Sequence, residues 1–236
     1  MTMMTITGGN SGIGLVTATA LARQGAEVVL ACRDTAKTTA ALDTINAQAT
    51  VPAVNLPVEL ASLQSIRELA ANFLARYDRL DVLINNAGLF PQKQQFTEDG
   101  FEMQFGVNHL APFLLTNLLL DCLKASAPSR VVTVSSTLHK KGAVDFDAPR
   151  GYEKYSGQKA YNASKLCNVL FAFELAKRLE GTGVTSNVLH PGAVATDIVR
   201  DFPWLVRKII GLVFISPEQG AKTSIMLASD SALAEV

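Results

Sequence analysis

The stretch Met3-Met4-Thr5-Ile6-Thr7-Gly8-Gly9-Asn10-Ser11-Gly12-Ile13-Gly14 decides the fold of this chain. A short apolar run, typical of a buried strand, passes into a glycine-rich turn, and a helical pattern follows at once. In such a turn Gly8 allows a tight bend, Gly12 lets the main chain approach a pyrophosphate, and Gly14 allows close helix–sheet packing. The first N–H groups of the helix would face the phosphates. The spacing is GxxxGxG rather than GxGxxG, so a turn without a ligand is the competing interpretation.

Strand-like and helix-like segments alternate along the rest of the chain. Short runs rich in Val, Leu or Ile are typical of parallel strands covered on both faces, and they occupy residues 3–7, 26–31, 51–56, 80–85, 130–135 and 184–189. Helical periodicity fills 12–24, 36–47, 62–77, 97–124 and 159–180. The alternation predicts an α/β fold. We expect one Rossmann-like domain over 1–236, a doubly wound parallel sheet of six strands with helices on both faces.

Charge and composition exclude several classes of protein. The 236 residues include 21 Lys and Arg against 21 Asp and Glu, so the formal net charge is zero. This balance leaves no basic footprint for nucleic acid or an anionic membrane surface. A content of 48% hydrophobic and 18% charged residues is not that of a disordered chain. We expect a folded protein whose partner is a small molecule.

Cysteine, histidine and hydropathy patterns bear on compartment and metals. Three widely spaced cysteines suit free thiols in a reducing cytosol, and three scattered histidines share no metal-ligand spacing. The first residues lack the basic and apolar regions of a signal peptide. The uncharged stretch 103–120 contains Gln104, Asn108 and Pro112, which favours a buried helix over a membrane span. We therefore expect a cytoplasmic protein with no metal and no transmembrane segment.

The end of the second predicted strand bears on the choice of nicotinamide cofactor. An acid there binds the ribose 2′-hydroxyl of NAD, whereas a nearby Arg accommodates the 2′-phosphate of NADP. Here Cys32 holds the strand end and Arg33 follows, with a planar guanidinium suited to a phosphate. Asp34 is a competing cue, although an acid at the start of the next helix is an ordinary N-cap or first-turn residue. The residues favour NADP, with NAD as the alternative.

Two Tyr-x-x-x-Lys pairs are candidates for acid–base chemistry. Residues i and i+4 share a helical face, and a lysine ammonium near a phenol favours the phenolate. Such a tyrosine can exchange a proton near neutral pH. The pair Tyr155/Lys159 contains Gly157 and reads as a loop, whereas Tyr161/Lys165 opens a helical segment. We predict catalysis by Tyr161 and Lys165, and solvated loop residues at Tyr155 and Lys159.

Taken in order, these motifs resemble those of the short-chain dehydrogenase/reductase family, over nearly the whole chain to about residue 230. The phrases LACRD, YNASKLCNVLF and GVTSNVLHPG are most similar to its retinol-dehydrogenase-like branch, which includes WW-domain oxidoreductases and generally prefers NADP. The resemblance implies hydride transfer between a nicotinamide and a lipophilic aldehyde, ketone or alcohol. The motifs that carry it are Thr7-Gly8…Gly12-Ile13-Gly14, Asn85-Asn86-Ala87-Gly88, Asn108, Ser135-Ser136, Tyr161/Lys165, Pro191-Gly192 and Thr196.

The resemblance also implies roles for single residues. Tyr161 would exchange a proton with the substrate oxygen, and Lys165 would hold the nicotinamide ribose and lower the pKa of Tyr161. Ser136 would polarise the substrate oxygen, with Ser135 as the alternative that merely faces the sheet. The implied cofactor-binding residues are Gly8, Asn10, Ser11, Gly12, Ile13, Gly14, Arg33, Glu59, Leu60, Asn86, Ala87, Gly88, Tyr161, Lys165, Pro191, Gly192, Val194 and Thr196.

Asn108 and a few departures from the family pattern need separate mention. Asn108 would hold a water in a proton relay, although a helix bend ahead of Pro112 is a competing explanation. Glu59-Leu60 stands where the family has an Asp that meets the adenine amine, and Thr133 replaces an Asn before the serine pair. The first strand begins almost at the first residue, and the sequence stops before the family's seventh, edge strand. We expect a six-stranded sheet without that strand, with the absence of part of the chain from this sequence as the alternative.

Two further features concern the substrate and the assembly. Residues 197–215 (DIVRDFPWLVRKIIGLVFI) are strongly apolar and hold the only Trp. We expect a lid over a lipophilic substrate there, with an interfacial helix or a core helix as alternatives. Segments 161–179 and 105–120 are apolar almost all round and need cover on every side. We expect a homodimer or homotetramer through these two helices.

Two other functions compete with the oxidoreductase. A non-catalytic nucleotide-binding regulator would keep the fold, but it would not need Asn108, Ser136, Tyr161 and Lys165 together. A sugar-nucleotide epimerase or dehydratase shares Tyr-x-x-x-Lys, but it usually shows a GxxGxxG turn and a longer C-terminal region. The four residues together favour the oxidoreductase.

Overall fold

One sheet of six strands organises the molecule, and all its neighbouring strands run parallel. The computed structural model describes residues 2–194 and 215–234. The strand order is β3-β2-β1-β4-β5-β6, with bounds β1 Met3–Thr7, β2 Glu27–Cys32, β3 Val54–Pro57, β4 Val82–Asn85, β5 Ser129–Val134 and β6 Val184–Leu189. The order reverses between β1 and β4, and doubly wound sheets bind ligands beyond the carboxyl ends of their strands at that point.

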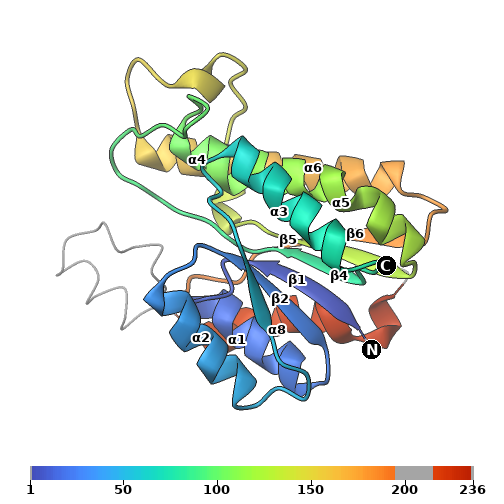
Figure 1. Cartoon of the computed structure of the whole chain (residues 1–236). Coiled ribbons are helices and arrows are strands. Elements are labelled where there is room, and N and C mark those ends of the chain that lie inside the picture. Colours follow the sequence, from blue (N-terminus) through green and yellow to red (C-terminus); the bar gives the residue numbers. More distant parts are fainter. Residues whose placement is uncertain (1, 195–214, 235–236) are drawn as a thin grey trace.

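Helices cover both faces of the sheet (Figure 1). One face carries α3 (Leu63–Arg76), α5 (Ala111–Ala125) and α6 (Gly157–Arg178), and the other carries α1 (Gly12–Arg23), α2 (Ala36–Asn46) and α8 (Pro217–Ser229). Shorter pieces are α4 (Met103–Phe105), the π-helical η1 (Gly106–Leu110), and the 3-10 turns η2 (Thr137–Lys141), η3 (Ala148–Arg150) and η5 (Ser231–Leu233). The predicted fold class, an α/β domain with a doubly wound six-stranded sheet, is confirmed.

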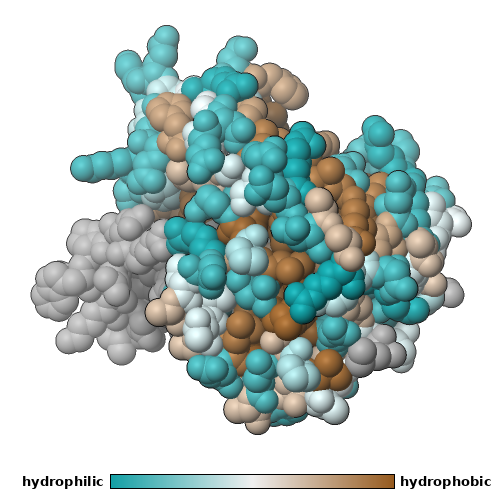
Figure 2. Space-filling model, in the orientation of Figure 1, coloured by the Kyte–Doolittle hydropathy of each residue, from teal (hydrophilic) through white to brown (hydrophobic). Residues whose placement is uncertain are grey.

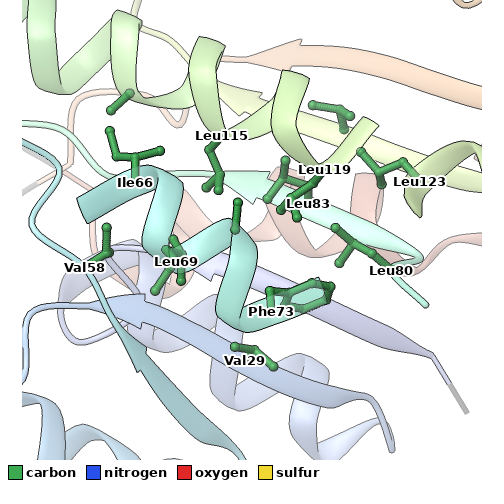
Figure 3. Packing of buried hydrophobic residues seen from close by; sticks show 14 of the residues in the cluster. Val29, Val58, Ile66, Leu69, Phe73, Leu80, Leu83, Leu115, Leu119 and Leu123 are labelled. Atoms are coloured by element: carbon green, nitrogen blue, oxygen red, sulfur yellow. The ribbon is translucent and has the colours of Figure 1, made fainter. Parts of the chain in front are cut away.

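The core is split in two by the sheet, because successive strand residues point to opposite faces. Met3 belongs to the cluster under α3 and α5, and Met4 belongs to the cluster under α1. In the first cluster Phe73 of α3 and Leu119 of α5 meet sheet residues, as Figure 3 shows. The outer surface in the same orientation is mostly hydrophilic, with apolar residues gathered near its centre (Figure 2). The two clusters hold the strand ends in place for the site.

Several predicted boundaries are wrong, each for a local reason. The helix predicted over 97–124 starts only at Met103, because Glu102 takes the N-cap and its side chain accepts from the N–H of Phe105. The third strand starts at Val54 rather than at 51, since Pro52 cannot donate to a neighbouring strand. Asp34 is not the N-cap of α2. Thr35 caps it through the N–H of Thr38.

The two Tyr-x-x-x-Lys pairs also differ from the prediction in one respect. Ser156 caps α6, so Lys159 lies in the first helical turn, and it is exposed as expected. Tyr155 is half-buried and hydrogen-bonded rather than solvated. The predicted lid over 197–215 and Thr196 lie outside the described residues, except that Ile215 forms a bridge with Val194. Among the described helices, none has the length and apolar character to span a membrane.

Candidate functional site

The glycine-rich turn between β1 and α1 has the geometry of a phosphate cradle. Gly8 and Gly12 have φ angles of 64° and 51°, the left-handed region that favours glycine. A Cβ on Gly14 would overlap the main-chain oxygen of Gly8 and come within 2.6 Å of Asn86 Nδ2. Ser11 is the N-cap of α1, yet its side chain makes no capping bond. Its hydroxyl and the first N–H groups of α1 therefore lack helical partners, which fits a dinucleotide's phosphates.

The end of β4 is fastened to this turn. The Asn86 side-chain amide donates to the main-chain oxygens of Thr7 at 2.9 Å and Gly8 at 3.4 Å. The Thr7 hydroxyl accepts from the N–H groups of Asn86 and Ala87, each at 3.0 Å. Gly88 follows, and a Cβ there would lie 3.4 Å from Lys165 Nζ. The segment Asn86-Ala87-Gly88 therefore joins the cradle to the catalytic candidates.

The ends of β2 and β3 meet at Arg33. Its guanidinium lies 3.8 Å from the Glu59 carboxylate, with side-chain exposures of 64% and 42%. Glu59 Oε1 also accepts from the N–H of Ala61 at 3.1 Å, and Leu60 packs on the core cluster under α3.

The cradle is linked to this strand end as well. The Asn10 side chain donates to Thr38 Oγ1 at 2.9 Å, and the Thr38 hydroxyl donates to the main-chain oxygen of Arg33 at 2.6 Å. The main chain at Arg33 is thus held beside the cradle.

Tyr161 and Ser136 lie together at the carboxyl end of β5. Tyr161, on α6, is only 7% exposed, and its ring stacks on that of Phe90 with centroids 4.5 Å apart. Burial raises the pKa of Tyr161 to about 12, while a hydrogen bond with the Ser136 side chain opposes the rise. The Ser135 hydroxyl instead donates to the main-chain oxygen of Lys165 at 2.8 Å, which anchors α6 to β5. The structure thus brings the second serine, and not the first, to the tyrosine.

Lys165 is fully enclosed one helical turn from Tyr161. Its Nζ donates to the Val134 main-chain oxygen at 3.1 Å and lies 5.7 Å from the centroid of the Tyr161 ring. Burial lowers the pKa of Lys165 to about 8. The sequence predicts that Lys165 lowers the pKa of Tyr161, but in this structure burial dominates both groups. It favours the neutral forms of the phenol and of the amine.

Asn108 occupies the π-helical segment η1 and clamps the residue after Gly88. Its Oδ1 accepts from the Leu89 N–H at 2.8 Å, and its Nδ2 donates to the Leu89 oxygen at 3.0 Å and to Ser164 Oγ at 3.1 Å. The helix irregularity expected ahead of Pro112 is therefore present, and Asn108 lies in it. Single-turn π segments are frequent at functional sites.

Sequence reasoning missed Asn168 and Phe90. Asn168 Nδ2 donates to the main-chain oxygen of Asn108 at 2.9 Å. The signal was its spacing, because Asn168 follows Lys165 by three residues and so shares its helical face. Phe90 gave no signal beyond its place two residues after Gly88.

The segment after β6 approaches the cradle through α8. Gly192 has a φ of 88°, and Val194 is buried. A Cβ on Gly220 of α8 would come within 2.7 Å of Val194 and 3.3 Å of Ile13. Val194 and Ile13, both predicted to bind the cofactor, therefore pack around the same glycine. Pro191 is half-buried between β6 and this segment.

The fold and this site define a dinucleotide-dependent oxidoreductase, and comparison with known proteins agrees. The family model for short chain dehydrogenase matches residues 2–203. Retinol dehydrogenase 14 of Homo sapiens is 49% identical over 244 residues, which cover 95% of this chain and 73% of the relative.

Solved structures are similar over almost the whole chain. An uncharacterized protein from Mycobacterium paratuberculosis shares 38% identity with a TM-score of 0.79, covering 98% of this chain and 77% of that one. The RhlG/NADP active-site complex of Pseudomonas aeruginosa shares 26% identity with a TM-score of 0.79, covering 100% and 91%. The chain belongs to the short-chain dehydrogenase family. It is an NAD(P)-dependent oxidoreductase that acts on CH–OH groups.

Proposed function

We propose that the chain is an NADP(H)-dependent oxidoreductase for lipophilic carbonyl and alcohol compounds, with Tyr161 as its acid and base. One observation carries the proposal. Tyr161 is buried beside Ser136, one helical turn from Lys165, where the β4 and β5 ends meet the phosphate cradle. A bound nicotinamide would supply or accept the hydride.

The residues of the site divide the remaining work. The Tyr161 hydroxyl donates its proton to a carbonyl oxygen, and Ser136 donates a second hydrogen bond that polarises that oxygen. Lys165 Nζ would hold the nicotinamide ribose. Because the pKa of Tyr161 lies near 12, the phenol is protonated at neutral pH, which suits carbonyl reduction. Alcohol oxidation needs the phenolate, so its rate increases with pH.

The preference for NADP rests on Arg33. Its main-chain oxygen is linked to the cradle through Thr38 and Asn10, and its guanidinium is a planar, bidentate donor suited to a 2′-phosphate. The Pseudomonas aeruginosa relative is described in complex with NADP, which is consistent with this choice. Comparison of kcat/KM for the two cofactors in wild type and Arg33→Ala tests it. We expect a loss of at least tenfold with NADPH and little change with NADH. An unaltered NADPH preference contradicts the assignment.

A lipophilic substrate is proposed from the likeness to retinol dehydrogenase 14 and from the apolar composition of 197–215. Small polar carbonyls and long-chain or isoprenoid ones, followed by NADPH absorbance, test this choice. Equal activity on both groups speaks against it.

The mechanism is tested with Tyr161→Phe, which removes only the hydroxyl. We expect activity to fall at least 100-fold on every active substrate, the scale of a lost general acid. Tyr77→Phe is the matched control, since Tyr77 follows α3 and packs on Phe73, away from the site. Activity that survives Tyr161→Phe overturns the proposal.

Assembly and location complete the proposal. Large apolar side chains are exposed on the two helices predicted to pair: Phe113 of α5 at 44%, and Leu170 and Phe173 of α6 at 50% and 65%. We propose that a second copy covers them in a homodimer or homotetramer of a cytoplasmic protein. Sedimentation tests the assembly, because a monomer at every concentration refutes it.

A further inference from the structure

Tyr155, the tyrosine of the unused Tyr-x-x-x-Lys pair, lies at the centre of a buried polar network. Its hydroxyl lies 3.1 Å from Glu102 Oε1, to which it donates, and accepts from Gln104 Nε2 at 2.9 Å. Gln104 is 0% exposed and Glu102 is 1% exposed. Lys159, the partner in the same motif, is exposed to solvent. A half-buried phenol with two buried polar partners belongs to a structural hydrogen-bond network and is not a solvated loop residue.

The network ties three segments together. Gln104 Nε2 also donates to the main-chain oxygens of Pro91 at 3.3 Å and Gly157 at 2.9 Å. The Tyr155 hydroxyl lies 3.3 Å from the same Pro91 oxygen. Glu102 Oε2 accepts from the Phe105 N–H at 2.8 Å and so fixes the start of α4. The loop at Pro91, the start of α4 and the first turn of α6 are therefore held in one arrangement.

The residue before Pro91 reaches the reacting group. The Phe90 ring stacks on the Tyr161 ring at 4.5 Å with an interplanar angle of 21°. Phe90 therefore covers one face of the Tyr161 ring. Gln104 and Tyr155 contact the main-chain oxygen of Pro91, the residue directly after Phe90. A shift of that loop would move the Phe90 ring relative to Tyr161.

Resting on the function proposed above, we infer that Tyr155 is a positioning residue. Together with Gln104 and Glu102, it holds Phe90 as a wall over Tyr161, and this wall limits the bulk of the groups beside the substrate carbonyl. Of Tyr155 and Phe90, Phe90 is the specificity-determining residue, because its ring lies directly against the Tyr161 ring. Glu102 contributes only through its hydrogen bonds to the Tyr155 hydroxyl and to the Phe105 N–H at the start of α4.

Among the described residues, few titratable or polar groups lie close to Tyr155, Glu102 and Tyr161. Burial raises the pKa of the Glu102 carboxyl, and burial also raises the pKa of Tyr155 to about 12, with Tyr152 as the other titratable neighbour. Ser136 and Lys165 are the polar groups that face Tyr161. Ser136 and Lys165 are unchanged in every variant proposed below. A change in the pH dependence of alcohol oxidation therefore reports on how the Phe90 ring covers Tyr161.

The experiment measures two quantities in purified full-length variants. The first is the ratio of kcat/KM for an unbranched aldehyde and for one branched at the carbon next to the carbonyl. The second is the pH at which alcohol oxidation reaches half its maximal rate. Phe90→Ala should shift the ratio toward the branched substrate at least tenfold, since a single methylene group in a pocket changes selectivity about 10–200-fold. It should also move the half-maximal pH down, because the phenol becomes less buried.

Tyr155→Phe separates positioning from mere packing. It retains the ring and removes the hydroxyl, and we expect both readouts to move in the direction of Phe90→Ala by a smaller amount. Tyr152→Phe and Lys159→Gln are matched controls and should leave both unchanged. Should Tyr155→Phe fold poorly, Phe90→Leu still tests the wall, with an intermediate shift expected.

The outcomes separate this inference from the proposed function. Unchanged readouts in Phe90→Ala overturn the wall, and unchanged readouts in Tyr155→Phe alone overturn the positioning role. Both conclusions require that Tyr161→Phe be inactive. If Tyr161→Phe is active, the proposed function fails, and the inference fails with it.

Discussion

The side-chain amide of Asn168 donates to the main-chain oxygen of Asn108 at 2.9 Å, across the contact between α6 and η1. In an α-helix that oxygen would pair with the N–H of residue 112, but Pro112 has none. Asn168 therefore satisfies a buried carbonyl at the helix irregularity that carries Asn108. Its own oxygen pairs with His109 Nδ1 at 3.2 Å.

Replacement of Asn168 by Leu should therefore destabilise the protein and slow the reaction. Loss of this buried hydrogen bond costs about 0.5–1.5 kcal/mol, and the clamp of Asn108 on Leu89 loosens with it. Chemical denaturation and kcat check the two effects. Asn117→Leu is the control, because its amide donates to the Phe113 oxygen on the exposed side of α5 and should cost under about 0.5 kcal/mol. Equal losses in both variants contradict this account.

Lys165→Met should abolish activity and yet stabilise the fold. Burial lowers the pKa of Lys165 from 10.5 to about 8, so the folded state disfavours the charged amine at neutral pH. The shift corresponds to about 3 kcal/mol at most. The Val134 oxygen would still accept from Asn168 Nδ2 at 3.4 Å. We expect the variant to be roughly 1–3 kcal/mol more stable at pH 7.

The pH dependence of that gain has a definite sign. The folded pKa lies below the unfolded one, so the wild type carries the full cost below about pH 8 and loses it as the pH rises toward 10.5. The difference in unfolding free energy between Lys165→Met and wild type should therefore shrink between pH 8 and 10.5. A difference that stays constant over this range means that burial of the charge is not its cause.

The sequence specifies the sheet and the local motifs better than the contacts that join them. Strand runs and the glycine turn are short-range patterns, so β1 and β6 have the predicted bounds. Ser136 and Tyr161 could be paired from their motifs, and the structure brings them together. The long-range contacts of Asn168 and Tyr155 could not, because they join segments that are more than 50 residues apart in the sequence.

The protonation states of Tyr161 and Lys165 could not be predicted from the sequence either. Spacing predicts a lysine near Tyr161, and this is correct, but the pKa of each group depends on how much water the finished fold excludes. Periodicity cannot report that quantity. The start of α4 could not be predicted for a similar reason. Glu102 acts as its N-cap only because the folded loop places it there.

Glu59→Gln should increase the affinity for NADPH without affecting NADH. Glu59 lies 3.8 Å from the Arg33 guanidinium, so it would compete for that group with the 2′-phosphate proposed to bind there. Both side chains are well exposed, so the pair is weak, and we expect the KM for NADPH to fall only about two- to threefold. The gain should disappear in the Arg33→Ala background and at high salt. An equal change for NADH would place the effect on the adenine rather than on the phosphate.

Gly14→Ala should disable the cradle, and it provides the most direct test of the turn. The added methyl would overlap the main-chain oxygen of Gly8 and lie 2.6 Å from Asn86 Nδ2, so either α1 must move away from β1 or the Asn86 bonds to Thr7 and Gly8 must break. Overpacking of this kind costs about 1–3 kcal/mol. Binding of both cofactors, followed by fluorescence or calorimetry, should fall at least tenfold. Gly88→Ala is the matched control for folding, because its Cβ would meet nothing nearer than 3.4 Å and should leave the unfolding free energy within about 0.5 kcal/mol of wild type. Normal cofactor binding by Gly14→Ala would show that the phosphates do not lie against the start of α1.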